Sequence, residues 1–130
     1  MRILITLPLV LTVFIAGCTS YTPTPTPTPV PTTTNTIEIT SDGFNPSSLT
    51  IKVGDTVTFV NKETTQHWPA SDIHPIHNIY PEGGGCIGSK FDACKGLKQG
   101  DSFSFTFSRS GRWCYHDHLN PVLTGCVDVQ

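Results

Sequence analysis

The chain has 130 residues, a formal net charge of −2 at pH 7, and a charged fraction of only 14%. Its basic residues form no cluster. This excludes the positive surface that binding of nucleic acid or electrostatic attachment to an acidic membrane requires. We therefore expect no nucleic-acid partner.

The N-terminus is typical of an exported, lipid-modified protein. Met1 and Arg2 precede an apolar run at 3–15, which has the length of a signal-peptide core and is short for a transmembrane helix. The IAGC sequence at 15–18 resembles the lipobox of bacterial-type lipoproteins, in which the Cys is acylated. We expect residues 1–17 to be a removed signal peptide and Cys18 to anchor the chain to a membrane, at the cell surface or in the periplasm. The alternative is an ordinary signal peptide with Cys18 as a free thiol.

A Pro/Thr-rich stretch follows the lipidation site, and we assign residues 18–36 to the lipidated Cys and its tether. Alternating Thr and Pro favour an extended polyproline II conformation, which rises about 3.1 Å per residue. This segment is therefore predicted to be a spacer. Residues 37–130 are then left to form one domain.

Apolar residues alternate with polar ones along most of this domain, which indicates half-buried β-strands. The runs are bounded by turn-forming pairs such as Asp42-Gly43 and Gly100-Asp101, and no window has helical periodicity. Closely spaced strands of this kind predict an all-β sandwich or barrel. The alternating apolar positions are Ile37, Ile39, Leu49, Ile51, Val53, Val57, Phe59, Phe103, Phe105, Phe107, Trp113, Tyr115, Val127 and Val129.

One long segment, 62–99, lacks this alternation and contains three of the five histidines. Long loops in compact domains are often functional. The domain also has four cysteines, an even number that predicts two disulfides in an exported protein, with three pairings available. We favour Cys86 with Cys94, which flank a short turn after three glycines, so that this disulfide pins the long loop. The second pair is then Cys114 with Cys126.

Several motifs together resemble the cupredoxins of the plastocyanin type. This resemblance implies a Greek-key β-sandwich with copper bound at one end, and it extends over nearly the whole domain. The motifs are GFNP at 43–46, LTIKVGDTVTFVN at 49–61, FTF at 105–107, GRWCYHDHLNP at 111–121 and VDV at 127–129.

The resemblance also places the copper ligands of that family, a His, a Cys, a second His and a Met. The first His falls on His67, whereas the other three positions hold Asp117, Asn120 and Leu123. Cys114 lies three residues before the Cys position and, by strand parity, on the opposite face. It lies opposite Cys126 if the last two strands pair around Asn120, which supports that disulfide. Without the thiolate, an intense blue copper centre is excluded.

All five histidines lie in two windows, 67–77 and 116–118, which the resemblance brings to one end of the sandwich. Two arrangements of a metal site remain open. In one, His67 and Asp117 face each other with a third ligand from the long loop. In the other, His116 and His118 share a strand face and are joined by His74 and His77. Imidazole and carboxylate ligands suit copper(II) or another divalent metal.

The sequence thus predicts a lipid-anchored protein that binds a metal ion, most simply copper, for metal handling or electron transfer. A redox protein or a metal-delivery protein would then be its partner. The alternative is a metal-free β-sandwich that acts as an interaction module. An enzyme is the least favoured class, since nucleophile, zinc-protease and phosphate-loop motifs are all missing from the sequence.

Overall fold

The computed structural model describes residues 35–130, so the expected signal peptide, Cys18 and the tether up to residue 34 lie outside it. The described part contains eight β-strands and no helix. Accordingly, none of its segments is a helix of the length and apolar character that crossing a membrane requires. The predicted all-β class is confirmed for these residues.

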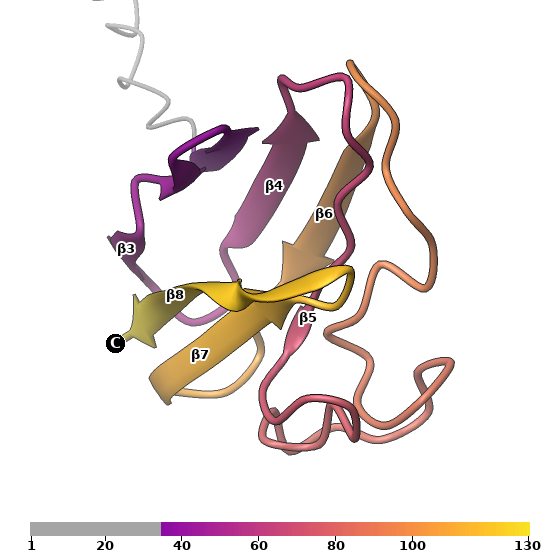
Figure 1. The fold of residues 1–130 in the computed structure, drawn as a ribbon. Coiled ribbons are helices and arrows are strands. Elements are labelled where there is room, and N and C mark those ends of the chain that lie inside the picture. The colour runs from indigo at the N-terminus through magenta and orange to yellow at the C-terminus, as the bar shows by residue number, and fades with distance from the viewer. Residues whose placement is uncertain (1–34) are drawn as a thin grey trace, which may run out of the picture. The chain divides into compact units, whose positions relative to one another are not determined.

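The strands form two four-stranded sheets (Figure 1). The first has the order β2-β1-β4-β6, and its strands are β1 (Thr36–Thr40), β2 (Gly43–Asn45), β4 (Thr56–Asn61) and β6 (Ser102–Thr106). The second has the order β3-β8-β7-β5, and its strands are β3 (Ser48–Ile51), β8 (Asn120–Val129), β7 (Gly111–Asp117) and β5 (Pro69–Ser71).

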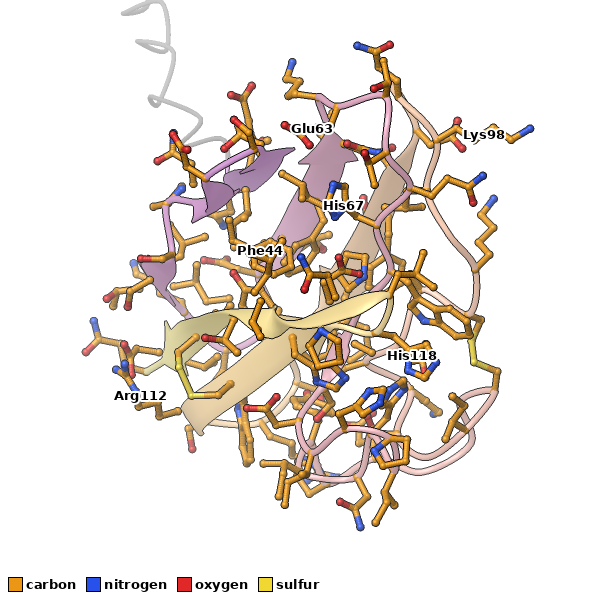
Figure 2. The ribbon with its side chains drawn as sticks, in the orientation of Figure 1. Phe44, Glu63, His67, Lys98, Arg112 and His118 are labelled. Atoms are coloured by element: carbon orange, nitrogen blue, oxygen red, sulfur yellow. A yellow bond between two sulfur atoms is a disulfide. The ribbon has the colours of Figure 1, made fainter. Side chains whose placement is uncertain are left out.

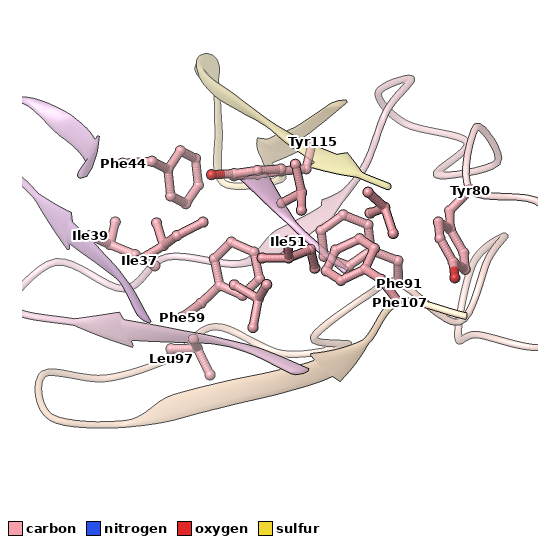
Figure 3. Close-up of a cluster of buried hydrophobic side chains, with 13 residues drawn as sticks. Ile37, Ile39, Phe44, Ile51, Phe59, Tyr80, Phe91, Leu97, Phe107 and Tyr115 are labelled. Atoms are coloured by element: carbon pink, nitrogen blue, oxygen red, sulfur yellow. The ribbon is translucent and has the colours of Figure 1, made fainter. Parts of the chain in front are cut away.

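The core lies between the sheets and follows from the alternation seen in the sequence. Ile37 and Phe59 of the first sheet and Tyr115 of the second are completely buried. The rings of Phe59 and Tyr115 meet edge to face, with centroids 5.1 Å apart (Figure 3). Such aromatic pairs add to the free energy gained by burying apolar area. The two sheets are therefore held face to face by inward side chains.

The long segment between β4 and β6 contributes to this core. Tyr80, Phe91 and Leu97 are buried, and the ring of Phe91 lies 5.0 Å from that of Phe107. The segment also contains β5, a three-residue strand that pairs with the edge of β7. It is therefore fixed to the second sheet by hydrogen bonds and packing.

Both favoured disulfides are present. Cys114 and Cys126 are directly opposed on β7 and β8, and their sulfurs are bonded. Cys86 and Cys94 close a turn within the long segment. Two short strands, β2 and β5, were not expected from the sequence, because each has only three residues and so shows no alternation.

Candidate metal centre

Four of the five histidines come together on the second sheet. His74, His77, His116 and His118 each offer a ring nitrogen, and these nitrogens all lie within 4.8 Å of one another. We call this group the four-histidine cluster. Two members come from the long segment, and two from β7 and the turn that follows it. The structure thus brings together the four histidines of the second arrangement, although His118 lies in the turn after β7 and not on the strand as expected.

The alternation of β7 explains the position of the cluster. Tyr115 points into the core, so its neighbour His116 points away from it, to the outer face of the second sheet. The long segment runs beside β7 here: the Asp72 amide donates to the Cys114 carbonyl at 3.1 Å, and the Asp72 side chain reaches the His116 ring. His116 is therefore covered and only 1% exposed. Figure 2 shows His118 beside this covering loop.

Two carboxylates orient the rings of the cluster. The His77 Nδ1–H donates to Asp92 Oδ2 at 2.7 Å, and the His116 Nδ1–H donates to Asp72 Oδ1 at 3.0 Å. A proton on Nδ1 leaves Nε2 with a free lone pair, the form in which imidazole binds metals. Both rings therefore present a bare nitrogen to the cluster.

Asp92 is the more heavily bonded of the two carboxylates, and its side chain is fully buried. Its Oδ1 accepts hydrogen bonds from Trp68 Nε1 at 2.6 Å and from the Cys94 amide at 2.8 Å. The same indole packs against His118, with ring centroids 4.5 Å apart. Asp92 also lies near the sulfurs of Cys86 and Cys94, but these are joined in a disulfide. It therefore links the disulfide turn to the cluster.

The backbone at His77 has an unusual conformation. Its φ is +54°, in the left-handed region that non-glycine residues seldom adopt, and its side chain is 0% exposed. The His77 carbonyl accepts from the Ser89 amide at 2.6 Å. This contact requires Gly88, because a Cβ there would collide with the carbonyl oxygens of Ile76 and His77. Strained backbone of this kind is common at functional sites.

The residues of the cluster fit a metal ion. His116 Nε2 is buried and has no hydrogen-bond partner among the described residues. The His77 Nε2 and His118 Nδ1 atoms lie 2.9 Å apart. Because His77 Nε2 carries no hydrogen, the N–H of His118 is the donor in this hydrogen bond. Ligands about 2.1 Å from one ion lie at most about 4.2 Å apart, so the widest pair need close by only several tenths of an ångström. An ion would replace the shared proton and satisfy the orphaned nitrogen.

The electrostatics of the cluster favour a divalent cation over protons. Burial lowers the pKa of His116, although its hydrogen bond to Asp72 works in the opposite direction. Burial also lowers the pKa of His118, and the neighbouring His77 and His74 lower it further. These rings are therefore neutral near pH 7. The carboxylates of Asp72 and Asp92 carry two negative charges that complement a doubly charged ion.

His67 and Asp117 form a separate pair outside the cluster. Their Nδ1 and Oδ2 atoms lie 2.8 Å apart, and both residues are buried. Asp117 Oδ1 accepts from the amides of Trp68 and Leu119. The only other acidic group beside His67 in the described part of the chain is Glu63, whose Oε2 lies 3.7 Å from His67 Nε2 (Figure 2). Glu63 does not bring a carboxylate oxygen close to both members of the pair, and the described residues form no group of three ligand atoms around His67 and Asp117.

Comparisons with known proteins agree with the architecture. No protein-family model matches the chain. It is similar to the amicyanin of Paracoccus denitrificans, with 29% identity over 96 residues, which are 72% of this chain and 63% of amicyanin. Thus the chain spans just under two thirds of the length of that relative.

Solved structures share the fold. A purple cupredoxin from Nitrosopumilus maritimus superposes with a TM-score of 0.59 and 24% identity, over 73% of this chain and 98% of that one. The Cu(I) form of a single-substitution amicyanin variant superposes with a TM-score of 0.55 and 26% identity, over 73% of this chain and 80% of that one. This is a cupredoxin-like domain.

The domain departs from the cupredoxin pattern at the expected copper positions. The first His position is occupied by His67, whose Nδ1 is bonded to Asp117, the residue at the Cys position. Asn120 and Leu123 stand at the other two positions. The structure contains no Cys/His/Met set among residues 35–130, because all four cysteines there are in disulfides. The four-histidine cluster lies instead on the outer face of the sheet.

Three functional residues were missed by sequence reasoning. Asp72, Asp92 and Trp68 surround the cluster but belong to no motif of their own. The weak signal available was that ligand histidines usually donate their second N–H to a carboxylate. Several acidic residues of the long segment met that description, and the sequence could not select among them.

Proposed function

We propose that this protein is an extracytoplasmic, lipid-anchored, cupredoxin-like protein that binds one divalent metal ion, copper(II), through His74, His77, His116 and His118. The observation that carries the proposal is the convergence of four ring nitrogens within 4.8 Å, one of them buried without a partner. The proposed role is metal handling, with a metal-delivery protein as partner. Electron transfer is less favoured because the thiolate of the family is missing.

Copper(II) is the favoured ion because of the donor set. Affinity for nitrogen ligands rises along the first-row divalent metals to Cu²⁺ and then falls at Zn²⁺. Cu(I) prefers sulfur, and the sulfurs of the four cysteines in the described domain are in disulfides. The amicyanin structure in the Cu(I) form supports copper as the family metal. A copper(II) site of nitrogen ligands alone would lack an intense blue band.

The anchor and location are supported by the N-terminal sequence alone. The apolar run at 3–15 and the IAGC sequence at 15–18 favour export and acylation of Cys18. Expression in a bacterium supplied with a labelled fatty acid tests this directly. Label should enter the wild-type membrane fraction and be lost in Cys18→Ala, and equal labelling of both would contradict the anchor.

Metal binding is tested by titrating the full chain with Cu²⁺, while electron paramagnetic resonance and visible absorption are recorded. One ion should bind per chain, and the fluorescence of Trp68 should be quenched because its ring touches His118. His118→Ala should weaken binding strongly. His67→Gln is the matched control, since His67 lies outside the cluster. Absence of stoichiometric binding, or an intense blue band, would overturn the proposal.

A metal-free interaction module is the second candidate. It is favoured by one observation, that His77 and His118 already satisfy each other through a hydrogen bond of 2.9 Å. Under this alternative, added Cu²⁺ would leave the thermal midpoint unchanged. Binding of an ion to the folded state alone would raise it.

A further inference from the structure

The four histidines are not held equally. His77, His116 and His118 are each fixed by at least one side-chain hydrogen bond. The side chain of His74 makes none with residues 35–130, and the residue is exposed. Its ring nevertheless lies over the cluster, 4.9 Å from the ring of His118 and 5.3 Å from that of His116. The cluster is thus a three-histidine base with a fourth ligand at its solvent side.

The backbone around His74 is held by hydrogen bonds, although its ring is exposed. The amides of Ile76 and His77 both donate to the Ile73 carbonyl, at 2.7 and 2.8 Å, which closes a tight turn around His74. The backbone therefore stays in place while the exposed ring is free to change rotamer, a motion of picoseconds to nanoseconds at the surface. The base cannot move in this way, since His77 and His116 are 0% and 1% exposed.

We propose that His74 is the exchangeable ligand through which the ion enters and leaves, so that the protein holds the ion as transferable cargo. This inference rests on the proposed function. The exchange is a ligand substitution: the bond between the ion and His74 breaks as a bond to an incoming imidazole or carboxylate forms. No electron moves, and the ion keeps its charge. The three-histidine base holds the ion until the acceptor supplies further ligands.

The position of His74 also determines what can act as acceptor. The nearby Ile73 and Ile76 are 58% and 56% exposed, so they add apolar surface beside His74. An acceptor that presents neutral imidazole can approach without repulsion by the ion. The carboxylates of Asp72 and Asp92 lie behind the rings, where they steady the base.

The experiment measures release of Cu²⁺ from the loaded full chain into a large excess of chelator. We expect His74→Ala to keep one ion per chain but to release it roughly tenfold faster or more, because affinity differences at one site appear mostly in the dissociation rate. Free imidazole added to His74→Ala should restore slow release. His118→Ala, which removes a base ligand, should lose stoichiometric binding and should not be rescued.

The outcomes separate this inference from the proposed function. Release from His74→Ala at the wild-type rate would show that His74 is no ligand. Complete loss of binding in His74→Ala, equal to that in His118→Ala, would show that it belongs to the base. Either result overturns the exchange role while copper binding by the wild type stands. Failure of the wild type to bind would overturn both.

Discussion

His67 Nδ1 and Asp117 Oδ2 lie 2.8 Å apart and buried, at the two positions where a cupredoxin would place a copper ligand pair. The carboxylate accepts a hydrogen bond from His67 Nδ1, so this nitrogen already has a partner. It also accepts hydrogen bonds from two backbone amides, those of Trp68 and Leu119. The positions that the cupredoxin resemblance assigns to copper are thus occupied by a hydrogen-bonded pair, and four other histidines gather elsewhere on the second sheet.

Asp117 is expected to be essential for stability and dispensable for metal binding. Asp117→Ala would leave the buried His67 ring and two partly buried amides without an acceptor, a loss of about 3–5 kcal/mol. Asp117→Asn would still accept from the amides and donate to His67 in its other tautomer, so it should lose much less. Chemical unfolding of the metal-free chain compares them. Equal unfolding midpoints for the two variants would refute this account of the pair.

The carboxylates behind the cluster should determine metal affinity. Asp92→Asn and Asp72→Asn would each weaken the hold on a ligand ring and should reduce copper affinity by about 10–100-fold. Asp92→Asn should be the more severe, because Asp92 is buried and also bonds Trp68. Isothermal titration measures both variants.

Asp128→Asn provides the control for these two variants. Asp128 pairs with Arg112 on the surface of β7 and β8, far along the strands from the histidines. Its loss should leave copper affinity within error of the wild type. If all three variants bound copper equally, the carboxylates would have no orienting role.

The strands and their faces were largely predictable from the sequence. Strict alternation at Ile37, Ile39, Val57 and Phe59 is read directly as a buried face, and these side chains are completely buried in the structure. The expected pairing of the last two strands placed Cys114 opposite Cys126, and the structure has these two residues paired and joined in a disulfide. β2 and β5 escaped prediction because three residues cannot establish a period.

The surroundings of the cluster were much less predictable. The histidines could be grouped because they are rare and lie in two windows, but two arrangements remained open. Which of the two arrangements forms depends on the path of the long segment beside the second sheet. That path is fixed by backbone hydrogen bonds such as Asp72 with Cys114 and Ser89 with His77. These join residues distant in the sequence through backbone groups, which carry no sequence signal.

Gly88 should be required for the position of His77. A methyl group there would meet the carbonyl oxygens of Ile76 and His77, so Gly88→Ala must push the two loop segments apart. We expect weaker copper binding together with a lower thermal midpoint. Gly83→Ala, in the same loop with no atom within 4 Å of the added methyl, is the matched control. A Gly88→Ala protein that binds copper as the wild type does would disprove the steric role.

Acid should destabilise the metal-free domain. Burial holds the pKa values of His116 and His118 below their usual value in the folded state, whereas in the unfolded chain they return to about 6.5. At pH values between the folded-state and the unfolded-state pKa, the unfolded chain binds more protons than the folded domain does. The free energy of unfolding therefore falls as the pH falls below about 6.5. Above pH 7 both states are neutral and these groups contribute no pH dependence. The exposed Glu82, whose pKa is lowered by a hydrogen bond from Ser108, adds a loss only at lower pH.

The thermal midpoint of the chelator-treated chain should therefore drop between pH 7.5 and 5.5, and the drop should be smaller in His118→Ala. That variant removes one of the two groups with a lowered pKa but leaves the groups that act on His116, namely Asp72, His77 and His74. Because protons and Cu²⁺ compete for the same nitrogens, saturation with copper should raise the midpoint at both pH values but enlarge the drop in the wild type, since the loaded folded state binds no protons at these rings. A midpoint that rises on acidification would show that the rings are charged in the folded state, and a cluster of charged rings could not hold a cation.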